Sequence, residues 1–252
     1  MFPLRDENPT ELFPFFTLLL VAANIAVWVL VQGAGLDEGT LVSSVCRFGA
    51  IPAEITGRPG SLPPGVPALC AEGGYTWLTL LTSMFLHGGW MHLIGNLWFL
   101  WIFGNNIEDS MGRFRFLLFY LLTGLAAAGA HIFSTPGSAI PTVGASGAIS
   151  GIMGAYLVLY PRVRVHTLFI FIVFIKVIPL PAWVMLLYWF AIQILLGTGT
   201  GADAAGVAFW AHIGGFAAGA VLVKVFERKQ LVEAKKAHVK LDRREIPHGG
   251  WW

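Results

Sequence analysis

Residues 73–107 contain no Asp, Glu, Lys or Arg, and most of them are apolar. A helix that crosses the hydrocarbon core of a bilayer needs about 20 mostly apolar residues. Over the whole chain only 12% of the 252 residues are charged and 56% are hydrophobic, whereas a soluble domain carries about 25% charged residues. We therefore predict an all-α, polytopic integral membrane protein whose surroundings are a lipid bilayer.

Turn residues and charges divide the apolar sequence into six predicted spans. The second span begins after His87-Gly88-Gly89, and Pro161 ends the fourth. An apolar run at 168–175 is too short to cross, so we expect it to be re-entrant or interfacial. The predicted spans are residues 13–31, 90–107, 116–133, 146–160, 181–196 and 204–223.

These spans divide the chain into three parts. Residues 1–12 form a short N-terminus, residues 13–226 a six-helix membrane domain, and residues 227–252 a basic tail. A Gly- and Pro-rich segment at about 34–75 is a large loop between the first two spans.

The distribution of Lys and Arg predicts the orientation. Eight of the 16 Lys and Arg lie from Lys224 onward, and positive loops stay on the cytoplasmic side of a membrane. Six spans then place both termini in the cytoplasm and the 34–75 loop outside. We expect a multi-pass protein of the bacterial inner (plasma) membrane. The clustered charge gives no support for a nucleic-acid partner.

Ser146 is the first candidate for chemistry. It lies in Gly144-Ala-Ser-Gly147, just after a turn and at the start of the fourth span. A helix N-terminus offers unpaired backbone N–H donors and the positive end of the helix dipole, which an oxyanion formed in acyl transfer requires. Alone, a small-Ser-Gly run is more often a packing feature.

His212 is the second candidate, in the outer half of the sixth span. Gly215 and Gly219 follow it on one helical face, and Gly147 and Gly151 have the same spacing beside Ser146. Because two such faces let helix backbones approach closely in a bilayer, we expect Ser146 and His212 to meet. A neutral imidazole in contact would supply the base that a serine nucleophile needs.

Two further polar residues lie in the second span. His92 and Asn96 are four residues apart and therefore share a helical face. Both can donate a hydrogen bond to an oxyanion, and both can equally be satisfied packing groups. Asn24 and Gln193 are single amides in other spans, which we assign to hydrogen bonds between helices.

Elimination narrows the chemistry to serine and histidine. The His-Glu-x-x-His motif of zinc proteases is absent, and the predicted spans offer no pair of carboxylates for an aspartyl protease. With no carboxylate available as a third member, a Ser-His dyad is expected rather than a triad.

Together these motifs resemble those of the rhomboid family of intramembrane proteases, over residues 77–223. The sequence HGGWMHLIGN at 87–96 is similar to the motif of its second helix, GASG at 144–147 to its nucleophile motif, and AHIGG at 211–215 to its base motif. GNNIE at 104–108 resembles a structural motif at the inner end of the same second helix.

The resemblance implies a six-transmembrane-helix rhomboid bundle and a serine endopeptidase that needs no metal or cofactor. Ser146 would be the nucleophile and His212 the general base. His92, Asn96 and the Ser146 amide would stabilise the oxyanion. The implied substrates are single-span membrane proteins, cut near the outer end of the transmembrane segment at a small residue.

The chain departs from some family members at two places. Trp77 is followed by Leu78 instead of Arg, and Ser150 stands where some members stack a Tyr on the catalytic histidine. His212 must then be oriented in another way, for example by an aromatic residue elsewhere.

Three points stay open at this stage. The alternative function is that of a catalytically inactive rhomboid-like protein that binds membrane clients. The oligomeric state is open. Cys46 and Cys70 both fall in the outer loop, where an oxidising compartment would allow a disulfide, although both can remain free thiols.

Overall fold

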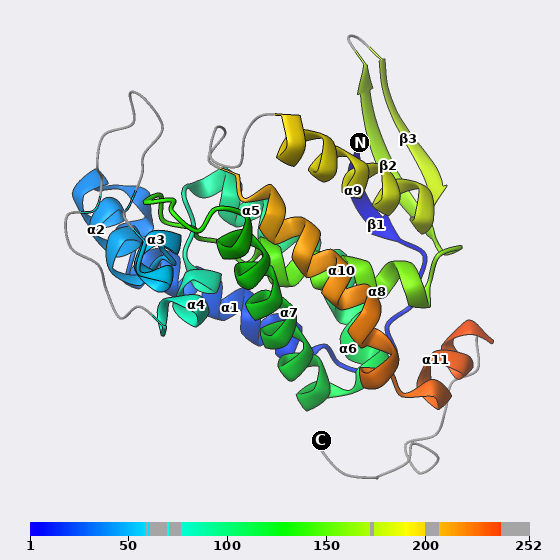
Figure 1. Ribbon diagram of the computed structural model, residues 1–252. Helices are drawn as coiled ribbons and strands as arrows, with labels where there is room; N and C mark the ends of the chain where they lie inside the picture. The colour runs from blue at the N-terminus through cyan, green and yellow to red at the C-terminus, as the bar shows by residue number, and fades with distance from the viewer. Residues whose placement is uncertain (59, 61–69, 71–76, 172–173, 200–206, 238–252) are drawn as a thin grey trace.

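The structure is a computed structural model, and it describes residues 1–58, 60, 70, 77–171, 174–199 and 207–237. It is mostly helical, and its helices form a bundle around α8 (Ser146–Leu159) (Figure 1). Every residue from Gly147 to Tyr156 in α8 is buried, so this short helix is the centre of the core.

Helices occur at the positions of all six predicted spans, although residues 204–206 of the sixth lie outside the described residues. The second is divided by a π-helical turn into α5, η3 and α6. The elements in chain order are α1 (Phe15–Leu30), α5 (Trp90–Phe99), η3 (Leu100–Gly104), α6 (Asn105–Met111), α7 (Arg113–Ser134), α8, α9 (Ala182–Gly199) and α10 (Phe209–Phe226). Within the described residues, α7, α9 and α10 are long and apolar enough to cross a membrane, and α1 and α8 are shorter apolar helices.

Glycines allow α8 and α10 to pack with their backbones in contact. A β-carbon added at Gly215 would collide with the carbonyl oxygen of Gly147, and one at Gly219 with that of Gly151. On the same interface, a β-carbon at Gly154 would collide with the carbonyl oxygen of Phe216. The predicted meeting of the two glycine faces therefore occurs in the structure.

The all-α prediction is wrong for part of the chain, because a three-stranded antiparallel sheet is present. Its order is β1 (Phe2–Asp6), β2 (Arg164–Phe171) and β3 (Phe174–Pro181). The run 168–175 was predicted to be re-entrant or interfacial, but its described residues, 168–171 and 174–175, belong to β2 and β3, which project beside α9 (Figure 1). The Val, Ile, Thr and Phe residues of these two strands have high strand propensity, and the N-terminal segment supplies β1 as the pairing partner.

The predicted loop at 34–75 contains short helices instead of being irregular throughout. These are η1 (Gly33–Gly35), α2 (Glu38–Phe48) and α3 (Pro52–Thr56), followed after the loop by α4 (Thr79–Thr82) and η2 (Ser83–Phe85). A disulfide joins Cys46 to Cys70, which resolves the choice that the sequence left open.

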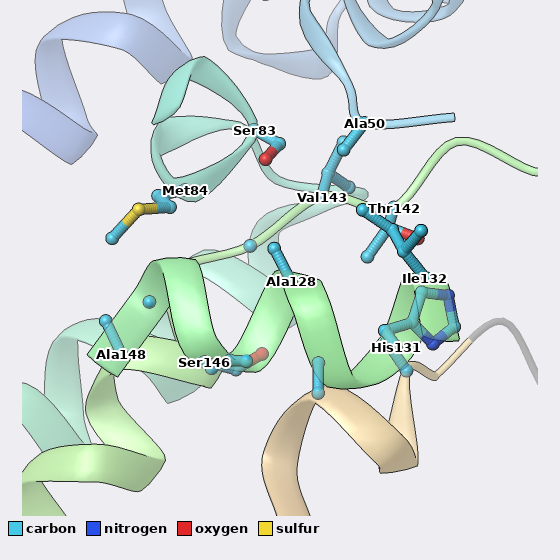
Figure 2. A pocket seen from close by; sticks show the side chains of 16 residues that line it. Ala50, Ser83, Met84, Ala128, His131, Ile132, Thr142, Val143, Ser146 and Ala148 are labelled. Atoms are coloured by element: carbon cyan, nitrogen blue, oxygen red, sulfur yellow. The ribbon is translucent and has the colours of Figure 1, made fainter. Parts of the chain in front are cut away.

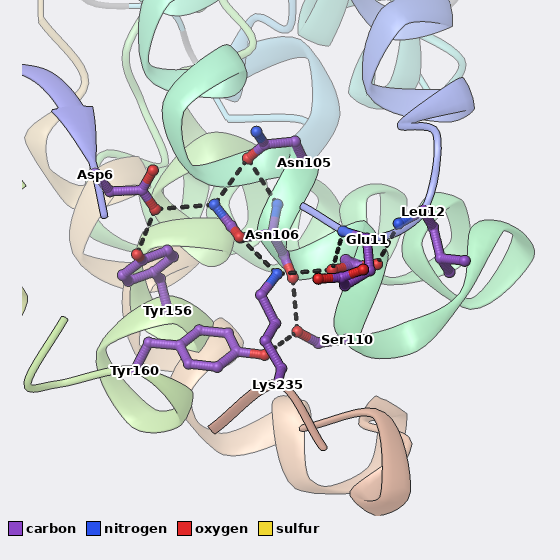
Figure 3. A network of polar contacts seen from close by, with 10 residues as sticks. Asp6, Glu11, Leu12, Asn105, Asn106, Ser110, Tyr156, Tyr160 and Lys235 are labelled. Carbon is purple, nitrogen blue, oxygen red and sulfur yellow. Dashed lines mark hydrogen bonds and ion pairs between the residues drawn. The ribbon is translucent and has the colours of Figure 1, made fainter. Parts of the chain in front are cut away.

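A polar network closes the end of the bundle opposite Ser146 (Figure 3). There α11 (Lys229–Lys236) docks through Lys235, whose ammonium lies 2.7 Å from Asp109 Oδ2 and 2.6 Å from Asn106 Oδ1. Asp109 also accepts hydrogen bonds from the backbone N–H groups of Glu11 and Leu12. Both ends of the described chain are therefore tied to α6.

Beside this network, Glu108 caps the start of α1. Its buried carboxylate accepts hydrogen bonds from the backbone N–H groups of Phe16 and Thr17 and from the Thr17 hydroxyl. Unpaired N–H groups at a helix N-terminus favour a negative charge. Glu108, the last residue of the 104–108 motif, therefore fixes the first helix to the second.

Candidate active site

Ser146 is positioned by a turn that only glycine accommodates easily. Gly144, two residues earlier, has a φ of +127°, and an added β-carbon would lie 2.8 Å from the ring of His92. Its backbone N–H donates to the Ser83 carbonyl at 2.8 Å. The chain then turns into α8 at Ser146, so that the Ser146 side chain and its backbone N–H both lie at a helix N-terminus.

The structure brings Ser146 and His212 together. His212 Nε2 lies 2.8 Å from Ser146 Oγ, within ordinary hydrogen-bond distance. His212 is in the first turn of α10, and the glycine contacts between α8 and α10 hold the two helices close enough for this bond. Both side chains are only partly buried.

The other face of the His212 imidazole contacts α9. Its Nδ1 lies 2.8 Å from Gln193 Oε1, and the Trp189 ring lies 5.7 Å from it, centroid to centroid, at an interplanar angle of 39°. Trp189 is thus the aromatic neighbour expected in place of a Tyr at position 150. Ser150 instead donates its hydroxyl to the Ser146 carbonyl oxygen at 2.6 Å.

The sequence prediction missed the contact of Gln193 with His212, because it assigned Gln193 only to hydrogen bonds between helices. One signal could have pointed to it. Trp189 and Gln193 are four residues apart, so an aromatic ring and an amide lie on the same face of an otherwise apolar helix.

His92 and Asn96 lie on α5. This helix contacts the turn that precedes Ser146. His92 Nδ1 accepts a hydrogen bond from the Gly88 N–H at 3.2 Å, and its ring packs against Gly144. The Asn96 amide nitrogen donates to the His92 carbonyl oxygen at 3.0 Å. Because that bond lies within its own helix, Asn96 would have to rotate its side chain to bind an oxyanion.

A small cavity of about 30 Å³ lies next to Ser146 (Figure 2). Its lining includes Ser83, His131, Thr142 and Ser146. A cavity needs about 10–15 Å³ to hold one water molecule, so there is room for about two. Polar side chains and space for water therefore occur beside the serine hydroxyl.

The comparison with known protein families identifies the chain. The family model described as "Rhomboid domain" matches residues 75–229, which is more than half of the chain. This chain belongs to the rhomboid family. Membership makes it a polytopic integral membrane protein, in agreement with its apolar helices.

Three relatives show what this rhomboid resembles. It is 36% identical over 146 residues to the rhomboid protease GluP of Bacillus subtilis (strain 168), which is 57% of this chain and 24% of GluP. It is 28% identical over 168 residues to the mitochondrial RHOMBOID-like protein 6 of Arabidopsis thaliana, 61% of this chain and 54% of that protein. It is 37% identical over 81 residues to the putative rhomboid protease YdcA of Bacillus subtilis, 32% of this chain and 40% of YdcA. The chain thus spans from about a quarter to about half of these relatives.

Proposed function

We propose that this rhomboid is an intramembrane serine endopeptidase, with Ser146 as nucleophile and His212 as general base. The observation that carries the proposal is the 2.8 Å contact between Ser146 Oγ and His212 Nε2 at the N-terminus of α8. A serine needs an adjacent base to become nucleophilic, and a helix N-terminus supplies donors for the oxyanion. Of its relatives, GluP is named a rhomboid protease and YdcA a putative rhomboid protease.

The reaction follows from this geometry. The Ser146 hydroxyl transfers its proton to His212 Nε2 as Oγ attacks the carbonyl carbon of the scissile peptide. The resulting oxyanion is stabilised by the Ser146 backbone N–H, together with His92 and Asn96 once these turn toward it. His212 then gives the proton to the leaving amine, and an acyl-enzyme ester remains on Oγ.

Water completes the cycle. The cavity beside Ser146 has room for about two water molecules. His212 accepts a proton from the attacking water, the hydroxide adds to the ester carbonyl, and Oγ leaves as it regains the proton. The products are two peptides, and no group outside the protein and water is needed.

The substrate and the orientation complete the proposal. The implied substrates are single-span membrane proteins, cleaved near the outer end of the transmembrane segment. We infer six spans with both termini in the cytoplasm, since the lysines of α11 and the two arginines in the first turn of α7, Arg113 and Arg115, lie at the end of the bundle opposite Ser146. The Cys46–Cys70 disulfide supports an oxidising environment on the Ser146 side.

The test compares Ser146→Ala with a matched control, Ser150→Ala. Ser150 is a serine one helical turn later whose hydroxyl donates to the Ser146 carbonyl oxygen, whereas the hydroxyl that is bonded to His212 is that of Ser146. We expect Ser146→Ala to abolish labelling by a fluorophosphonate probe and cleavage of a transmembrane model substrate, because loss of a nucleophile costs about 10⁶-fold in rate. Ser150→Ala should keep both activities.

Thermal unfolding in detergent shows that each variant is folded. Near-normal cleavage by Ser146→Ala would contradict the assignment of the nucleophile. If the wild type binds the substrate but neither reacts with the probe nor cleaves, the alternative of an inactive client-binding rhomboid replaces the protease.

A further inference from the structure

Gln193 is a buried amide on α9, an otherwise apolar helix, at the point where α9 contacts His212. The residue is 7% exposed, and burial of an amide is unfavourable unless it forms hydrogen bonds. Its Oε1 lies 2.8 Å from His212 Nδ1. The oxygen of this buried amide is therefore paired with the same imidazole that contacts Ser146.

We propose that Gln193 is a positioning residue that holds His212 with its proton on Nδ1 and the lone pair of Nε2 directed at Ser146. The proposal rests on the proposed function, because orientation of this imidazole matters for catalysis only if Ser146 and His212 are the reacting pair.

The chemistry of the amide explains why the His212 proton is held on Nδ1. A side-chain amide oxygen only accepts hydrogen bonds, and a neutral imidazole carries one N–H. A bond from Nδ1–H to Oε1 therefore leaves Nε2 without a proton, which is the state that accepts the Ser146 proton. When His212 becomes an imidazolium during the reaction, Nδ1–H keeps the same acceptor.

The neutral amide suits its surroundings. In soluble serine proteases a carboxylate orients the histidine, but a charged side chain within a membrane helix is costly. Gln193 performs the orienting part without a buried charge.

Gln193 is part of a stripe on α9 that faces α10. Trp189, Gln193 and Gly197 are spaced four residues apart and share one face. The Trp189 ring packs on His212, and a β-carbon added at Gly197 would lie 3.1 Å from Phe209 Cβ. One helix therefore fixes the imidazole through both its ring face and its Nδ1 edge.

The rest of α9 is peripheral (Figure 1). Its outward face exposes large apolar side chains, among them Leu187, Tyr188 and Leu195. A displacement of α9 away from α10 would remove Trp189 and Gln193 from His212 together.

The first arm of the test compares Gln193→Met with Gln193→Glu. Methionine matches glutamine in length but replaces the amide oxygen with a thioether, which is only a weak acceptor. Glutamate keeps an oxygen at the same reach. We expect Gln193→Met to lower the rate of Ser146 labelling by a small fluorophosphonate, and kcat for the substrate, by about 10- to 100-fold. KM should change little, and Gln193→Glu should restore most of the rate.

Asn24→Leu is the matched control, since Asn24 is a buried amide on a different helix, α1, where its nitrogen donates to the Leu20 carbonyl oxygen. It should leave the labelling rate unchanged. Equal losses in the Met and Glu variants, or a wild-type rate in Gln193→Met, would overturn the proposal.

The second arm does not depend on activity. The ring-¹⁵N spectrum of histidine-labelled protein reports which nitrogen carries the proton, and the His212→Asn variant assigns the His212 signals. We expect the Nδ1–H tautomer in the wild type and a mixture in Gln193→Met. An Nε2–H tautomer in the wild type, or no change in the variant, would contradict the proposal. If the tautomer depends on Gln193 while the wild type neither labels nor cleaves, the orienting role stands and the protease function falls.

Discussion

At the scale of single residues, Asp6 shows how burial changes the pKa of a carboxylate. Its Oδ2 accepts hydrogen bonds from the Tyr156 hydroxyl and from the Asn106 amide (Figure 3). Burial raises the pKa of Asp6 to about 6, and the Tyr156 hydrogen bond and the Lys235 charge only partly oppose this rise. The folded protein therefore holds the Asp6 proton more tightly than the unfolded chain does.

This difference predicts a pH effect on stability. Because the pKa of Asp6 is higher in the folded state than its ordinary 3.8, the free energy of unfolding should fall as the pH rises from about 4 through 6, by up to about 3 kcal/mol. Asp6→Asn should remove this contribution to the pH dependence of the free energy of unfolding. Thermal unfolding at pH 5 and pH 7.5 checks it, with the wild type losing more stability than the variant.

Asp37→Asn is the control for this comparison. Asp37 is an exposed N-cap, and hydrogen bonds from the Thr40 side chain and from the Thr40 backbone N–H lower the pKa of Asp37. Its titration therefore lies below pH 5, and its replacement should leave the difference between pH 5 and 7.5 unchanged. The same pH dependence in the wild type and in Asp6→Asn would assign the effect to another group.

At the scale of helices, the contact between α8 and α10 determines whether the candidate pair can form. Gly215 and Gly219 place the α10 backbone directly on the carbonyl oxygens of Gly147 and Gly151. His212 lies one and two turns before these glycines on the same face. Any side chain inserted there must push the helices apart near the reacting atoms.

We therefore predict that Gly219→Val destabilises the protein by about 1–3 kcal/mol, as overpacking of a filled core does, and that it also slows Ser146 labelling. Gly129→Ala on α7 is the control, because no atom lies within 4 Å of an added β-carbon there. Unfolding midpoints and labelling rates of both variants are the measurements. A Gly219→Val variant as stable and as reactive as Gly129→Ala would show that the interface can open without cost.

The sequence was sufficient to predict this interface, because the glycine spacing on both segments demanded close backbones. It was not sufficient for the β2–β3 hairpin. A short apolar run can belong to a strand or to a buried helical segment with the same periodicity, and its partner β1 lies more than 150 residues away in the chain.

The role of Gln193 could not be predicted from the sequence for a different reason. Its contact with His212 depends on the rotation of α9 about its own axis, which the packing of several helices decides. An almost uniformly apolar segment gives no clear polar face from which to read that rotation.

At the scale of the whole molecule, the disulfide loop is linked to the turn that carries Ser146. Cys46 on α2 is bonded to Cys70. Shortly after α2, Ala50 pairs with Thr142 through two backbone hydrogen bonds, and the Ala53 N–H donates to the Ser138 carbonyl. The loop therefore braces the segment that leads into α8.

We predict that reduction of this disulfide destabilises the protein by about 3 kcal/mol, the amount expected from loop-closure entropy for cysteines this far apart. They are separated by 24 residues. Intact mass after alkylation should show two added groups only when a reductant is present. Unfolding midpoints with and without reductant measure the loss, and the double variant Cys46→Ser/Cys70→Ser should be insensitive to reductant. Alkylation of both thiols without reductant would exclude the bond.

The position of β1 in the sheet also bears on how the chain is made. Residues 2–6 are translated long before their partner strand, residues 164–171. At about 5–20 residues per second, β1 waits roughly 8–30 seconds for its partner. During that time α1 and α5 to α8 can enter the bilayer. His212 is translated later still, so under the proposed function Ser146 lacks its base until α10 has been made.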